Sequence, residues 1–146
     1  MVLRREAIEE RLKELDEILQ ELAKFRDITW EAFRTSLSQR WIIERGLIAA
    51  ASVIFDVADH ILAGHFGFYA ETYEESLQSL RDRQVISEKL YRRIKGVGGF
   101  RNILVHCYLG VDPREVFENF HKGVRVFPLF AQEVLTWLDK VEGEER

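Results

Sequence analysis

The stretch RNILVHCY, residues 101–108, places an arginine, an asparagine, a histidine and a tyrosine within about two helical turns. A histidine can take and give a proton near neutral pH, and the guanidinium fork of arginine suits a phosphate group. Together these side chains fit metal-independent cleavage of RNA, in which a base activates the ribose 2′-hydroxyl and an acid protonates the leaving 5′-oxygen. One histidine would have to do both from opposite sides of the phosphorus, so the chemistry favours two copies in a symmetric dimer.

A helical projection of this stretch separates an apolar face from a polar one. At about 100° per residue, the residues expected to contact the core are Phe100, Ile103, Leu104 and Cys107. The opposite arc holds the candidate site residues Arg101, Asn102, His106 and Tyr108. The same arc includes Gly98, Val105 and Leu109, which are poor choices for a face that meets only water. We therefore expect a second subunit there, with the glycines at 96, 98 and 99 allowing its backbone to approach closely.

The elements that must position this stretch are all predicted to be helices. Apolar residues recur at three- and four-residue spacing, and no window has the alternation of short strands. The expected helices cover about 3–24, 29–63, 73–83, 87–109 and 113–141. Pro128 should kink the last of these or divide it in two. The predicted fold class is all-α, an antiparallel bundle of four to five helices.

Composition sets the class of protein. A chain of 146 residues with 47% hydrophobic residues is expected to form a single domain over residues 1–146. The single cysteine, Cys107, excludes an internal disulfide, and the charged beginning of the chain has no apolar signal region. The longest apolar run, Leu47 to Phe55, is far shorter than the roughly 20 residues of a membrane span. We expect a cytoplasmic protein with no membrane partner.

The charge is unevenly distributed along the chain. The formal net charge is -4, which argues against a generic nucleic-acid binder with a basic surface. Residues 81–101, however, contain seven basic and two acidic residues, a local charge of +5. This basic run is either a solvated face or a track for an RNA backbone, and the sequence leaves both open.

The pattern formed by Arg101, Asn102, His106 and Tyr108 matches the R-N-x-x-x-H-x-Y signature of the HepT-like toxins. These toxins are a branch of the HEPN (higher eukaryotes and prokaryotes nucleotide-binding) superfamily of helical-bundle ribonucleases. The segment from Glu44 to Ile61 resembles the family's long second helix, with its acidic residue at Asp56. Residues 72–112 resemble its helix, turn and motif-bearing helix. The resemblance extends over about residues 4–140.

The resemblance implies a role for each of these positions. Arg101 and His106 would be the ribonuclease pair, acting in a homodimer whose two motifs form one cleft. Asn102 would orient the histidine or the phosphate, and Asp56 would support the site. Tyr108 resembles the tyrosine that a minimal nucleotidyltransferase antitoxin modifies with AMP, as in a type VII toxin–antitoxin pair. No cofactor or metal is implied.

Each of these residues also has a simpler interpretation. His106 could be a surface histidine hydrogen-bonded to Asn102 one turn earlier, and Arg101 a surface charge paired with an acid. Tyr108 could only seal the bundle, and Asp56 could be a structural hydrogen-bonding residue. The motif ENFH gives a single Glu-x-x-His where di-iron bundles use two, so metal binding is not expected. The three tryptophans, at 30, 41 and 137, are expected to be packing residues.

Two other classes of function remain open at this point. The chain could be a non-catalytic nucleotide- or partner-binding subunit of a nucleotidyltransferase complex, in which Arg101 grips a phosphate of ATP. It could also be a purely structural bundle, which would bind neither RNA nor nucleotide. The ribonuclease hypothesis differs from both because it requires RNA turnover in the presence of a chelator.

Overall fold

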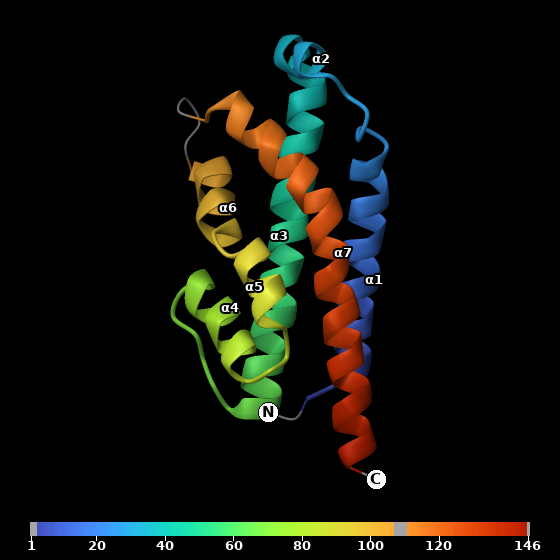
Figure 1. Ribbon diagram of the computed structural model, residues 1–146, viewed down its shortest axis with the longest axis vertical. Helices are drawn as coiled ribbons and strands as arrows, with labels where there is room; N and C mark the ends of the chain where they lie inside the picture. Colours follow the sequence, from blue (N-terminus) through green and yellow to red (C-terminus); the bar gives the residue numbers. More distant parts are fainter. Residues whose placement is uncertain (1–2, 107–110, 146) are drawn as a thin grey trace.

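The computed structural model describes residues 3–106 and 111–145, and over these ranges the chain forms helices and no strand. Figure 1 shows them as an elongated bundle, which confirms the predicted all-α class. The helices of the described ranges are α1 (Arg5–Ala23), α2 (Trp30–Thr35), α3 (Leu37–Phe66), α4 (Tyr73–Asp82), α5 (Glu88–Ile94), α6 (Val97–His106) and α7 (Pro113–Glu144).

Two of the five predicted helices are each divided in the structure. The pattern expected over 29–63 breaks at Ser36, whose backbone is extended and whose hydroxyl caps α3 by accepting from the Gln39 amide. Thr29 caps α2 in the same way. The pattern expected over 87–109 breaks at Gly96, which has a left-handed φ of 91°. Serine caps and left-handed glycines both compete with helix continuation, and tertiary packing decides whether they are used.

Pro128 is predicted to kink the last helix or to divide it in two. Helix α7 is continuous through Pro128, so the division is wrong, and the kink stays a prediction. Asp112 caps the helix through the Arg114 amide, and Pro113 occupies its first turn. A proline in a helix removes one backbone hydrogen bond. Here the residues on either side of it, Phe127 and Phe130, are buried and hold both halves against the core. Most helical stability in proteins comes from such packing rather than from local propensity.

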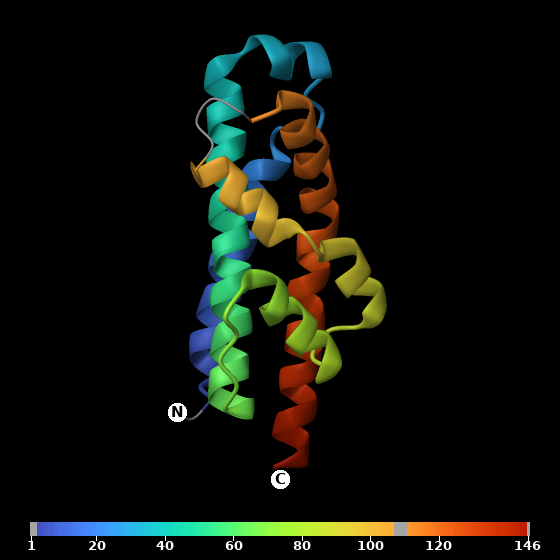
Figure 2. The ribbon, with the colours of Figure 1, turned by 90° about the vertical axis from the view of Figure 1, so that its left-hand side faces the viewer.

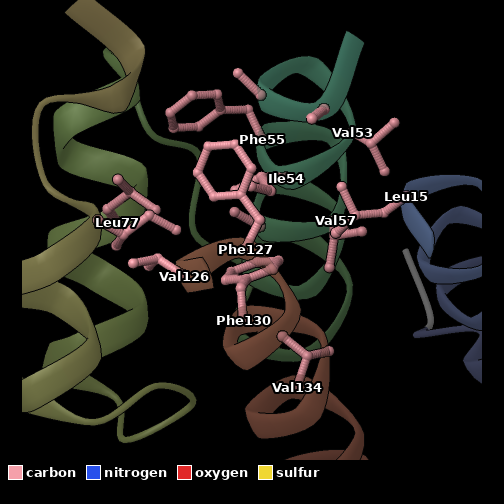
Figure 3. Close-up of a cluster of buried hydrophobic side chains, with 14 of the residues drawn as sticks. Leu15, Val53, Ile54, Phe55, Val57, Leu77, Val126, Phe127, Phe130 and Val134 are labelled. Atoms are coloured by element: carbon pink, nitrogen blue, oxygen red, sulfur yellow. The ribbon is translucent and has the colours of Figure 1, made fainter. Parts of the chain in front are cut away.

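Helices α1, α3 and α7 lie side by side along the length of the molecule (Figure 1). Helix α1 runs antiparallel to both α3 and α7. Helices α4, α5 and α6 form a second layer, in which α6 crosses in front of α3 (Figure 2) and α5 contacts α7. Helix α2 lies at the end of the bundle where α3 begins (Figure 1). Figure 3 shows the core between the layers, where Phe55 from α3, Phe127 from α7 and Leu77 from α4 point toward one another. The motif-bearing helix therefore rests on an apolar base built by the other elements.

The central helix α3 is by length and composition apolar enough to cross a membrane, with a mean hydropathy of 1.7 over its most apolar window. More than half of that window, 56%, is buried inside the bundle, which is typical of a core helix. Trp137 is buried and Trp30 packs against Phe33 and Phe117, as expected of packing residues. Trp41 is 62% exposed, so the packing prediction is wrong for it.

Candidate active site on helix α6

The start of α6 is fixed by one carboxylate on α4. Glu74 accepts a hydrogen bond from the Tyr91 hydroxyl at 2.6 Å and another, at 3.4 Å, from the Gly96 backbone amide. The hydrogen bond to Glu74, more than burial, raises the pKa of Tyr91. The Arg81 guanidinium lies 4.2 Å from the centre of the Tyr91 ring on its other side. This arrangement holds the α5–α6 corner against α4.

Gly98 brings α6 into direct contact with its own bundle. A Cβ atom at this position would meet the Cβ of Tyr73, with the Tyr73 Cγ at 3.0 Å and the Phe55 Cζ at 3.1 Å. The close approach expected for a second subunit is therefore made at Gly98 by the same chain, and that part of the sequence interpretation is wrong. Gly99, in contrast, has no atom within 4 Å of such a Cβ. It remains open to contact from outside.

The two faces of α6 agree only partly with the helical projection. Phe100 is buried, and Leu104 packs against the core. Ile103 is 37% exposed, so its assignment to the core is wrong. The reason is that α6 lies at the edge of the bundle and contacts α3 and α4 along a narrow stripe. Cys107, the last residue assigned to that face, lies outside the described residues.

Arg101 is half-buried. It has no carboxylate partner among the described residues. Its Nη1 donates to the Asn102 side-chain oxygen at 3.3 Å, and its guanidinium lies 5.7 Å from the centre of the Tyr73 ring. Its Nε is buried and meets no acceptor in the described part of the chain. The simple interpretation of Arg101 as half of a surface ion pair is wrong within these ranges. Most of its donors are free for an anion.

His106 is exposed and is the last described residue of α6. The Asn102–His106 hydrogen bond of the simpler interpretation is not made in the described part of the chain, where the Asn102 side-chain oxygen accepts from Arg101. His106 lies five positions after Arg101. On a helix this step corresponds to a rotation of about 140° and a rise of about 7.5 Å. A single copy therefore directs the two side chains to different sides of α6. Tyr108 lies outside the described residues.

Besides Asp56, which the sequence indicated, a second acidic residue of α3 lies beside the motif. Asp59, on α3, accepts a hydrogen bond from the Ser76 hydroxyl at 2.7 Å and lines the same hollow as Asn102. Burial raises the pKa of Asp59, the Ser76 hydrogen bond opposes the rise, and the nearby Asp56 carboxylate adds to it. Asp56 itself is exposed and accepts no hydrogen bond from the described residues. The signal for Asp59 was its position one helical turn after Asp56.

The family model described as "Ribonuclease HepT-like" matches residues 8–134, which is most of the chain. The chain belongs to the HepT-like ribonuclease family. The family resemblance is thereby confirmed, and it supports a nuclease that acts on RNA. The roles of Arg101, Asn102, His106 and Tyr108 stay predictions.

Individual relatives agree with this assignment. The chain is 31% identical over 137 residues to the tRNA nuclease HepT of Aphanizomenon flos-aquae strain 2012/KM1/D3, covering 94% of this chain and 93% of that protein. The cytosolic protein YutE of Bacillus subtilis has a TM-score of 0.78 and 21% identity, covering 96% of this chain and 94% of its own.

A Shewanella oneidensis HEPN toxin, solved in a tri-AMPylated form in complex with an MNT antitoxin, has a TM-score of 0.81 and 16% identity. The match covers 91% of this chain and 99% of that one. At this identity the two solved structures show that the helical fold is shared. The HepT-like ribonuclease fold is thus established by sequence and by structure.

Proposed function

We propose that this HepT-like protein is a toxin-type, metal-independent endoribonuclease that cleaves RNA in a cleft between two copies of the chain. The observation that carries the proposal is the state of Arg101, which is half-buried and has unsatisfied donors and no carboxylate partner among the described residues. An arginine held in this way is an anion-binding group. The motif histidine, exposed on the same helix, supplies the proton-transfer chemistry.

In the proposed reaction Arg101 binds the scissile phosphate and stabilises the charge that develops on it. His106 of one copy takes the proton from the ribose 2′-hydroxyl, and His106 of the other copy protonates the leaving 5′-oxygen. The angular separation of Arg101 and His106 on α6 supports two copies, because one helix cannot direct both side chains to one phosphorus. Asn102 orients Arg101 through its side-chain oxygen. Asp56 supports the site through its charge, which acts on Asp59, and Asp59 lines the same hollow as Asn102.

The partner in this proposal is a minimal nucleotidyltransferase antitoxin that transfers AMP to Tyr108. The S. oneidensis HEPN toxin of similar fold was solved AMPylated and bound to an MNT antitoxin, which supports this choice of partner. Tyr108 follows His106 by two residues, so AMP attached there would add bulk and negative charge beside the motif. The phosphate of the RNA would then be repelled from Arg101. The toxin and its antitoxin would act in the cytoplasm.

The test is RNA cleavage by purified protein in excess EDTA. Wild type should degrade single-stranded RNA and tRNA, and Arg101→Ala and His106→Ala should each lower the rate by a factor of about 10² or more. The matched control is Arg92→Ala, an exposed arginine of the same basic run that is already paired with Glu88. Light scattering must show that all three variants keep the oligomeric state of wild type. Equal and negligible cleavage by wild type and both motif variants would refute the proposal.

The free donors of Arg101 also favour a second candidate function, the binding of ATP without RNA turnover as a subunit of the nucleotidyltransferase complex. Titration calorimetry with ATP separates the two. Binding of ATP that is abolished in Arg101→Ala, together with intact RNA in the cleavage assay, would favour the binding subunit over the nuclease.

A further inference from the structure

Arg101 lines a pocket that the sequence did not predict. The pocket is lined by residues of α3, the α5–α6 corner and α7, and its cavity volume is about 30 Å³. Figure 2 shows how these elements lie relative to one another. We call it the basic pocket, because four cationic side chains surround it, Arg93, Lys95, Arg101 and Lys122. Apolar side chains form its floor, among them Leu47, Phe100 and Phe127.

The charge of the basic pocket is not compensated by the protein. No acidic residue lines it, and within residues 3–106 and 111–145 none of the four cations takes part in an ion pair. Other cations of the basic run are occupied: Arg81 and Arg92 pair with Glu88, and Arg83 stacks on Phe68. Arg93, Lys95 and Arg101 of the run instead line the pocket, while Lys89 is exposed away from it. Clustered positive charge beside a low-dielectric wall concentrates the field that attracts an anion.

The fold, rather than the sequence, brings these charges together. Arg93 lies in the last turn of α5 and Lys95 directly follows that helix, Arg101 belongs to α6, and Lys122 comes from the first third of α7. Asn119, one turn before Lys122, also lines the pocket. Its amide nitrogen donates to the Glu115 carbonyl at 2.9 Å, which leaves its side-chain oxygen without a donor from the described residues. An acceptor, an apolar floor and a ring of cations are the groups that a nucleotide of an RNA strand requires.

We propose that the basic pocket binds the nucleotide of the RNA substrate that neighbours the scissile phosphate. Arg93, Lys95 and Lys122 hold its phosphate, while Arg101 contacts the scissile phosphate beside it. A cavity of about 30 Å³ is too small to enclose a base, so the base lies across the mouth of the pocket, within reach of Asn119. This inference rests on the proposed ribonuclease function, because only under that function is the ligand at Arg101 an RNA strand.

The test compares two charge reversals, Lys122→Glu in the pocket and Lys89→Glu as the matched control. Lys89 is an exposed lysine of the same basic run that does not line the basic pocket. For cleavage of a fluorescent single-stranded RNA in EDTA, Lys122→Glu should raise KM about tenfold with little change in kcat. It should also reduce the dependence of binding on salt concentration by about one unit of slope, whereas Lys89→Glu should change KM about twofold at most.

The outcomes separate this proposal from the proposed function. If wild type cleaves RNA and the two variants share one KM, the basic pocket proposal is overturned and the ribonuclease function stands. If wild type does not cleave RNA, the function fails, and fluorescence anisotropy with the same RNA decides the pocket. Weaker RNA binding by Lys122→Glu than by Lys89→Glu would then support it, and equal binding would overturn it. A loss confined to ATP binding, measured in parallel, would also overturn the RNA assignment.

Discussion

Two adjacent glycines at the start of α6 allow a sharp test of how the motif helix is held. An alanine at position 98 would place its Cβ against Tyr73 and Phe55, at distances of 3.0 Å from the Tyr73 Cγ and 3.1 Å from the Phe55 Cζ. The Tyr73 and Phe55 rings pack against each other, tilted by 33° with centroids 4.3 Å apart, so neither can rotate away without disturbing the other. An alanine at position 99 meets no atom within 4 Å.

The expected magnitude follows from these two environments. Replacing glycine by alanine in a helix contributes up to about 1 kcal/mol of stability, and this gain is common to both positions. Overpacking at position 98 costs about 1–3 kcal/mol, because α6 or the Tyr73 side chain must shift. Gly98→Ala should therefore unfold with a free energy about 1–3 kcal/mol lower than that of Gly99→Ala. The difference between the unfolding free energies of the two variants no longer contains the shared effect of helix propensity.

Urea denaturation followed by circular dichroism measures this difference, with both proteins at one concentration. RNA cleavage by folded Gly98→Ala should also fall, since α6 carries Arg101 and His106 away from their supports. A difference in unfolding free energy below about 0.5 kcal/mol would show that α6 does not dock on Tyr73 as described. If Gly99→Ala lowers the free energy of unfolding, and this loss disappears when the protein is diluted to monomer, a second copy must lie against Gly99.

Two further predictions concern stability. Burial, with the nearby Arg11 and Arg4, lowers the pKa of His60, so the folded protein binds this proton less readily than the unfolded chain does. The stability that neutral His60 contributes is complete above the ordinary pKa of about 6.5 and is lost as the pH falls below it. Urea titrations between about pH 5 and pH 8 should therefore show that the free energy of unfolding of His60→Gln falls less steeply toward acid than that of wild type. An identical fall in both proteins would contradict the assignment. Tyr91→Phe removes the hydrogen bond to Glu74 and should lower the free energy of unfolding by about 1.5–3 kcal/mol, since the acceptor is charged. Unchanged stability in the same titration would mean that Glu74 does not hold the α5–α6 corner.

Much of the fold could be predicted from periodicity and end signals. Helices α1, α4 and α7 begin and end within a few residues of the predicted bounds. For α4 and α7 the reason is that Thr72 and Asp112 are strong caps that act locally. The breaks at Ser36 and Gly96 were missed because a serine or a glycine within an apolar pattern is compatible with a continuous helix. Helix α3 also extends past Gly64 to Phe66, since only Gly67 adopts the left-handed conformation that ends it.

The sequence by itself determined the fold class, the family and the candidate pair Arg101 and His106. Those follow from residue type and spacing along one helix, which are local properties. Tertiary structure decided which charges are free. Lys122 lies 21 positions from Arg101, and no spacing rule relates two residues on helices that meet only through folding. Tertiary structure likewise decided that Gly98 faces its own bundle and that Asp59 joins Asn102, because contacts between helices depend on how they pack and not on the period of either one.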